Sequence, residues 1–142
     1  MNIVKVESFA VAGKEARTSN AREISGHGVI GSMWSSGLPA GSLIVAVYSD
    51  YQSDKDGEYF YLLGTKLGDE ETAPRELAYR KVPAGQYLQL SFVGSVSPEA
   101  TVGLWRQVWD WESEGTLRRA YKTDFEIYTG GGFELYVGIK SI

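Results

Sequence analysis

Residues 97–139 have the sequence SPEATVGLWRQVWDWESEGTLRRAYKTDFEIYTGGGFELYVGI, which predicts one helix followed by two strands. Ser97 is a good N-cap, and Pro98 fits the first helical position, where its missing N–H leaves no hydrogen bond unmade. Apolar residues then recur at helical spacing until Gly115, which marks the end of the helix. The last parts of this segment are predicted as a strand at Ala120–Tyr128, a glycine turn at 130–132 and an alternating strand at Phe133–Ile139.

The beginning of the chain has a similar order of elements. Residues 3–13 are rich in β-forming side chains and predict a strand region. Residues 20–36 predict a helix, because Ile30 and Trp34 stand four positions apart. We expect Ser19 or Asn20 to cap this helix and the run Gly37-Leu38-Pro39 to end it.

A β-hairpin is predicted next. Residues 43–51 and 58–67 are β-branched and aromatic, and the segment between them ends in Asp56-Gly57, which is a strong hairpin signal. Residues 76–93 then supply further strand-like sequence around a turn at 82–86, just before the second helix.

Each half of the chain therefore has the order β–α–β–β, with a helical tryptophan, Trp34 or Trp109, about 75 positions apart. We expect a single domain over residues 1–142, with pseudo-repeat halves of about 1–70 and 71–142. The predicted fold class is α+β. Its antiparallel sheet would carry both helices on one face, with a cleft between the two halves.

The composition excludes several kinds of chemistry. The 142 residues include no cysteine and only one histidine, His27, so disulfides, cysteine nucleophiles and zinc fingers are excluded and we expect no metal or cofactor. The net charge is −4 and the basic residues are scattered, which argues against direct DNA binding. No stretch approaches the ~20 apolar residues of a membrane span, so we expect no membrane association and a cytoplasmic protein.

Residues 26–31, GHGVIG, match the pattern G-x-G-x-x-G. A dinucleotide site needs a strand before these glycines and a helix that begins on them, whereas Ala21–Ser25 already has the pattern of a helix start. We therefore interpret the glycines as a small-residue face of a helix that lets another element approach closely.

Glu126 is the most informative residue. It lies in the segment DFEIY, residues 124–128, and glutamate is depleted in strands. Alternation places it on the same strand face as Asp124 and Tyr128. Spacing alone favours a Glu126 that points to solvent from a sheet covered on one side, and a Glu126 inside the cleft is the alternative.

Four segments in this order resemble the effector-binding domain of the GyrI-like superfamily, which also occurs fused to AraC-type and MerR-type regulators of drug response. The chain is most similar to the small stand-alone, integron-associated effector-binding proteins. The resemblance spans essentially the whole chain. The segments are GEYFYLLGTKL at 57–67, VPAGQYLQLSFVG at 82–94, TVGLWRQVWDWESEG at 101–115 and DFEIY at 124–128.

The resemblance implies a multidrug-type pocket between the halves, with aromatic walls and one buried acid, a role that falls on Glu126. Such a carboxylate is costly to bury and tends to take up a proton, so a lipophilic cation that pairs with it relieves that cost. Aromatic faces add cation–π attraction. The expected function is binding of cationic amphipathic molecules, for sensing or sequestration. The expected ligand-binding residues are Glu126, Trp34, Tyr48, Tyr61, Trp105 and Trp109.

Two other classes of function stay open. One is a small hydrolase in which Glu126 is the general acid/base, although no catalytic residue is assigned and a binding protein is favoured over an enzyme. The other is a gyrase-inhibitor-like interaction module with a filled cleft. The effector domain accounts for all 142 residues, so a role in transcription regulation would need a separate DNA-binding partner. A homodimer is also left open.

Overall fold

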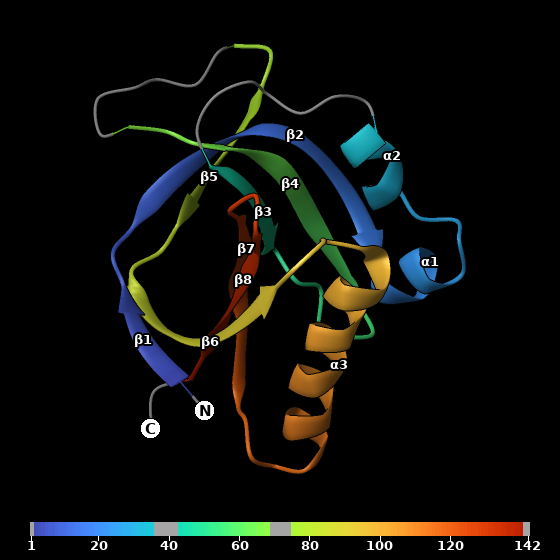
Figure 1. The fold of residues 1–142 in the computed structure, drawn as a ribbon, viewed down its shortest axis with the longest axis vertical. Coiled ribbons are helices and arrows are strands. Elements are labelled where there is room, and N and C mark those ends of the chain that lie inside the picture. Colours follow the sequence, from blue (N-terminus) through green and yellow to red (C-terminus); the bar gives the residue numbers. More distant parts are fainter. Residues whose placement is uncertain (1, 36–42, 69–74, 141–142) are drawn as a thin grey trace.

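The computed structural model describes residues 2–35, 43–68 and 75–140. It is an α+β structure in which a strongly curved antiparallel sheet carries helices on one side (Figure 1). The elements are β1 (Asn2–Val6), β2 (Phe9–Ser19), α1 (Asn20–Ile24), α2 (Ile30–Ser35), β3 (Ile44–Ser49), β4 (Glu58–Lys66), β5 (Ala78–Val82), β6 (Gly85–Val93), α3 (Pro98–Ser113), β7 (Arg119–Tyr128) and β8 (Gly132–Ile139).

The sheet has eight strands in the order β1-β6-β8-β7-β3-β4-β2-β5, and every neighbouring pair is antiparallel. The central pair, β3 and β7, joins the N-terminal half of the chain to the C-terminal half. The order is symmetric about this pair, because β3-β4-β2-β5 on one side corresponds to β7-β8-β6-β1 on the other. The first strand of each half therefore lies at the outer edge of the other half. Strand β1 pairs with β6, and β5 pairs with β2.

Two predictions for the N-terminal half need correction. The strand region at 3–13 is divided into β1, which is one edge strand of the sheet, and β2, which lies next to the opposite edge strand, β5. The single helix expected over residues 20–36 is two short helices, α1 and α2, and its predicted end at 37–39 lies outside the described residues. Ser19 does cap α1, because its side chain accepts a hydrogen bond from the Arg22 amide.

The C-terminal elements match their predictions closely. Ser97 caps α3 by accepting a hydrogen bond from the amide of Ala100, and Pro98 occupies the first turn. Gly115 follows the helix with a positive φ of 80°, a conformation that glycine adopts without strain. This helix therefore begins and ends where the sequence predicts.

The two faces of the sheet have separate cores. One core contains side chains from the sheet together with Trp105 and Val108 of α3, and the partly buried Ile30 and Trp34 of α2 pack against it. The other core consists of strand residues, among them Phe125. Alternation along β7 divides its side chains between the two faces, with Phe125 and Ile127 on one and Tyr128 on the other.

Candidate functional site

Glu126 lies on the helix-covered face of β7 and is 0% exposed. The solvent-facing position that spacing alone favours is therefore wrong, because this face of the sheet is covered by α2 and α3. Its cross-strand neighbours are Ala46 on β3 and Leu135 on β8. Both neighbours are apolar, so neither of them supplies a charge to balance the carboxylate.

Three aromatic residues donate hydrogen bonds to this carboxylate. The Tyr48 hydroxyl and the Trp105 indole N–H donate to Oε2, with donor–acceptor distances of 2.9 and 2.8 Å. The Tyr128 hydroxyl donates to Oε1 at 2.6 Å. The carboxylate is thus held by three polar hydrogens, each carried by an aromatic ring from a different element.

The environment of Glu126 makes its ionised form more costly than it is in water. Burial raises the pKa of the Glu126 carboxyl, and the hydrogen bonds from Tyr128, Trp105 and Tyr48 lower it without cancelling that effect. The pKa of Tyr48 is also raised, mainly by burial and then by the charge of Glu126. Among the described residues, no lysine, arginine or histidine forms an ion pair with Glu126.

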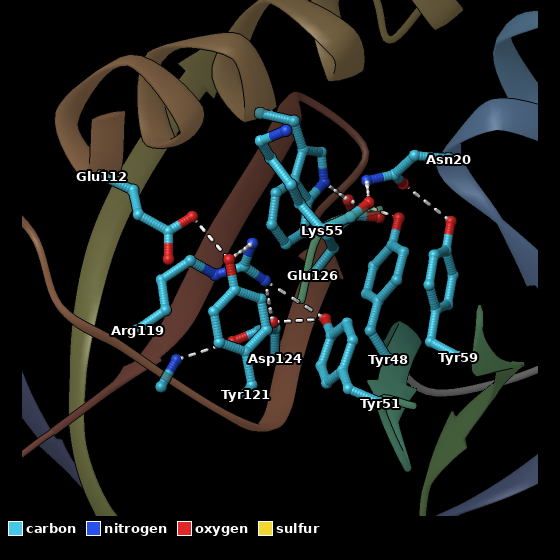
Figure 2. A network of polar contacts seen from close by, with 12 residues as sticks. Asn20, Tyr48, Tyr51, Lys55, Tyr59, Glu112, Arg119, Tyr121, Asp124 and Glu126 are labelled. Carbon is cyan, nitrogen blue, oxygen red and sulfur yellow. Dashed lines mark hydrogen bonds and ion pairs between the residues drawn. The ribbon is translucent and has the colours of Figure 1, made fainter. Parts of the chain in front are cut away.

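Asp124 lies two residues before Glu126 on β7 and has its own set of polar partners (Figure 2). Arg119 donates from Nη2 to Asp124 Oδ2 at 2.7 Å, and both side chains are almost completely buried. Tyr51 donates its hydroxyl to the same carboxylate, and the amide of Gly138 donates to Oδ1 at 2.8 Å. Burial, the largest single influence, lowers the pKa of Arg119, but the charge of Asp124, the neighbouring Tyr51 and Tyr121 and the hydrogen bond to Asp124 together raise the pKa above its ordinary value.

A register shift in β7 lies between the two members of the Arg119–Asp124 ion pair. The pairing with β8 is irregular between Arg119 and Asp124, and Tyr121 within that stretch has a positive φ of 54°. The Arg119 guanidinium lies against three aromatic rings, 4.3 Å from the ring centroid of Tyr121, 5.3 Å from that of Trp105 and 5.6 Å from that of Tyr51. The ring of Trp105 thus faces Arg119, while its N–H points to Glu126.

A cavity of about 650 Å³ lies between the short helices and α3, and Glu126 is part of its wall. Its volume lies within the ~300–1,000 Å³ that is typical of small-molecule pockets. The five aromatic residues predicted from the sequence are all brought together here, and so is the carboxylate. The predicted residues in the wall are Trp34, Tyr48, Tyr61, Trp105, Trp109 and Glu126.

Trp34 connects α2 to the sheet. Its indole N–H donates to the Tyr61 hydroxyl at 2.9 Å, and its ring packs edge-on against Tyr128, with the ring centroids 4.7 Å apart. Neither α1 nor α2 contains a buried residue. This side of the cavity is therefore held by a few specific contacts rather than by a deep core.

Glu23 supplies another of those contacts. It accepts hydrogen bonds from the Thr18 hydroxyl and from the amides of Val29 and Ile30 at the start of α2. A Cβ on Gly28 would lie 2.2 Å from the Glu23 carboxyl group, so a larger residue at this position would displace that side chain. The glycine pattern at 26–31 therefore lies at the connection between α1 and α2, and its interpretation as one helix face is wrong.

Comparison with known proteins identifies the family. The model of the GyrI-like small molecule binding domain matches residues 1–136. The chain belongs to this GyrI-like family. An integron cassette protein from the mobile metagenome of Vibrio cholerae has a structure that superimposes with a TM-score of 0.84 and 28% identity, over 98% of this chain and 95% of that one.

Two further proteins are similar to this GyrI-like chain, one in sequence and one in fold. YobU of Bacillus subtilis (strain 168), whose name proposes a role as a transcriptional regulator, is 27% identical over 159 residues, which cover 98% of this chain and 97% of YobU. The structure of SAV2435 bound to tetraphenylphosphonium has the same fold, with a TM-score of 0.73 and 16% identity over 99% of this chain and 93% of SAV2435.

Sequence reasoning missed several residues of the GyrI-like cavity. Tyr128 shares a strand face with Glu126, so alternation could have identified it. Tyr59 could have been found in the same way, because it stands two positions from Tyr61 on β4. Glu23 and Arg119 had no such signal, since their positions depend on the connection between α1 and α2 and on the irregular part of β7. The cavity residues that the prediction did not include are Asn20, Glu23, Ile24, Ile30, Tyr51, Lys55, Tyr59, Thr101, Val102, Arg119 and Tyr128, with others at its rim.

No group of three or more potential metal ligands occurs in residues 2–35, 43–68 and 75–140 of this GyrI-like domain. None of the helices in that same part of the chain is long and apolar enough to cross a membrane.

Proposed function

We propose that this GyrI-like domain binds cationic, lipophilic small molecules in the cavity beside Glu126, to sense or to sequester them. One observation carries the proposal: Glu126 is completely buried, accepts three hydrogen bonds from neutral donors, and has no cationic partner among the described residues. An uncompensated buried carboxylate is costly, and a bound cation removes that cost.

The walls of the cavity support the same ligand class. Tyr48, Tyr61 and Trp105 present aromatic surfaces around the acid. Such surfaces attract a cation by about 0.5–2 kcal/mol each and also bury the apolar parts of a ligand. Tetraphenylphosphonium, bound by the structurally similar SAV2435, is a lipophilic cation of this kind.

The alternative functions fit the geometry less well. A hydrolase would need Glu126 to reach its substrate, but Glu126 has no exposed surface. An interaction module with a filled cleft would not leave a cavity of about 650 Å³. Mass spectrometry of candidate substrates after incubation with the protein, and a pull-down with gyrase, test these two alternatives directly.

The proposal is tested by a titration that follows tryptophan fluorescence, since three of the four tryptophans line the cavity. Tetraphenylphosphonium is compared with tetraphenylsilane, which has the same shape and no charge. We expect saturable binding of the cation and much weaker binding of the silane. Equal affinity for the two compounds would overturn the proposal.

In a regulatory role the domain would act in the cytoplasm with a separate DNA-binding partner, as the name of YobU encourages. A pull-down from cells with and without the cation would identify such a partner by its ligand dependence. Recovery of no DNA-binding protein in either condition would favour sequestration instead. Analytical ultracentrifugation with and without the cation would test the homodimer.

A further inference from the structure

The two carboxylates that line the cavity have little capacity left for a ligand's hydrogen bonds. An ionised carboxylate offers about four acceptor positions. Glu126 uses three of them for Tyr48, Trp105 and Tyr128. Glu23 uses three as well, for the Thr18 hydroxyl and the amides of Val29 and Ile30.

The exposed surface next to Glu126 belongs to its donors. Glu126 is 0% exposed, whereas Tyr48 and Trp105 each keep 7% of their surface exposed and Tyr128 is half-buried. All three donors line the cavity. A molecule in the cavity therefore touches these aromatic residues, whose polar hydrogens point away from it toward the carboxylate.

We infer that Glu126 acts on the ligand through these three rings and does not contact it, so that the site selects cations without N–H donors, such as quaternary ammonium or phosphonium ions, over protonated amines. This inference rests on the proposed function. It adds that the charge of Glu126 acts through its aromatic donors, and it names the subclass of cation that the cavity binds most tightly.

The physical reason lies in what each kind of cation needs when it leaves water. A hydrogen bond to an ionised acceptor is strong and polarises its donor. An O–H or N–H that donates to Glu126 thereby leaves more electron density on its own ring, and the ring face becomes a better site for a cation. A quaternary cation needs only such faces.

A protonated amine has a different requirement. Its N–H groups are strongly hydrated, and each one buried without an acceptor is costly. Glu126 has one acceptor position left and no exposed surface through which to offer it, and the partly buried Glu23 also has only one left for several N–H groups. The attraction of the amine's charge is then offset by the loss of its hydrogen bonds to water.

The experiment is calorimetric titration of the full chain at neutral pH with naphthylmethyl-trimethylammonium, naphthylmethylammonium and the neutral neopentylnaphthalene. The first two carry the same ring and charge and differ in their N–H donors. We expect the quaternary ion to bind about tenfold more tightly than the primary ion. Equal or tighter binding of the primary ion would overturn the inference and leave the proposed function intact. If the neutral compound bound as well as the quaternary ion, the proposed function itself would fail.

A pair of variants tests the role of the rings. Tyr128→Phe keeps the ring and removes one donor to Glu126. The matched control is Tyr136→Phe, because the Tyr136 hydroxyl donates to Glu134, also two residues away on its strand, and lies in the core of the opposite face. We expect Tyr128→Phe to weaken binding of the quaternary ion severalfold and to reduce the ratio of its affinity to that of the primary ion. We expect Tyr136→Phe to leave both the affinity and the ratio unchanged. Tighter binding of both ions by Tyr128→Phe would show direct contact with the carboxylate and would refute the inference.

Discussion

Asp124 and Glu126 stand two residues apart on the same face of β7, and both are 0% exposed. Asp124 has an internal cation, Arg119, together with donors from Tyr51 and Gly138. Glu126 has three donors and, among the residues that the structure describes, no cation. The two carboxylates thus share a strand, a face and a degree of burial, but within residues 2–35, 43–68 and 75–140 only Asp124 has a basic side chain as its ion-pair partner.

This difference separates a structural acid from a candidate binding acid. Arg119 lies among aromatic rings and beside a carboxylate, which is the environment that we propose for the ligand at Glu126. Trp105 belongs to both arrangements, since its ring faces Arg119 and its N–H donates to Glu126. The protein therefore carries, next to the cavity, an internal cation among aromatic rings, although Arg119, unlike the ligand that we propose, also donates directly to its carboxylate.

The largest expected effect is on stability at Asp124. Asp124→Asn leaves the Arg119 guanidinium buried without its counter-ion, and breaking a buried ion pair in this way costs about 3–5 kcal/mol. We expect urea unfolding to show a loss of this size. The control is Glu126→Gln, which removes a buried charge without leaving a buried counter-ion unpaired. This variant should not lower the free energy of unfolding. A loss below about 1 kcal/mol for Asp124→Asn would contradict the structural role of the pair.

The next effect is on binding at Glu126. A unit charge about 5 Å away at an effective dielectric constant of about 20 contributes about 3 kcal/mol. Glu126→Gln should therefore weaken tetraphenylphosphonium binding by about 100-fold, while tetraphenylsilane binding stays the same. Fluorescence titration of both compounds measures this difference. An unchanged affinity for the cation would contradict a role of Glu126 in binding and would leave no difference in function between Glu126 and Asp124.

Acidity provides a third comparison. The pKa of the Glu126 carboxyl is raised in the folded protein, so protonation of this group stabilises the fold. This contribution to the free energy of unfolding is fully present below the ordinary carboxyl pKa of about 4.3, and it is lost as the pH rises through the raised pKa. Cation binding favours the ionised form. Affinity should therefore increase with pH, by up to about tenfold per unit, and level off above the raised pKa. Calorimetry at several pH values tests this rise, and Glu126→Gln should abolish it; a rise that persists in that variant would assign it to another group.

The smallest expected effect concerns the wall opposite α3. Trp34→Phe removes the indole N–H that donates to Tyr61 and part of the packing against Tyr128. We expect cation affinity to fall by about 1 kcal/mol, with little change in global stability, because α2 has no buried residue. Titration and thermal unfolding of the same variant separate these outcomes. A fall as large as that of Glu126→Gln would mean that the wall, and not the acid, dominates binding.

The sequence predicts best the elements whose signals are local. The helix α3 has a cap and a terminal glycine in its own sequence, and β7 and β8 show clear alternation. The place of β1 at the far edge, next to β6, depends on a pairing between distant residues that no local pattern encodes.

The candidate site shows the same limit. Alternation groups Glu126 with Tyr128, but it does not say which face of the sheet is covered, so spacing alone placed the acid in solvent. The family resemblance supplied the correct face. The pairing of Arg119 with Asp124 passes through an irregular stretch at Tyr121, where simple alternation no longer applies.

The central pairing of β3 with β7 also has a consequence for how the chain folds. Tyr48 and Glu126 are 78 positions apart, and their contact requires both halves of the chain to have docked. Contacts of such long sequence separation form late, because the entropy of closing a large loop must first be overcome. Binding competence should thus require both halves of the chain, because a fragment ending after β4 would lack Glu126.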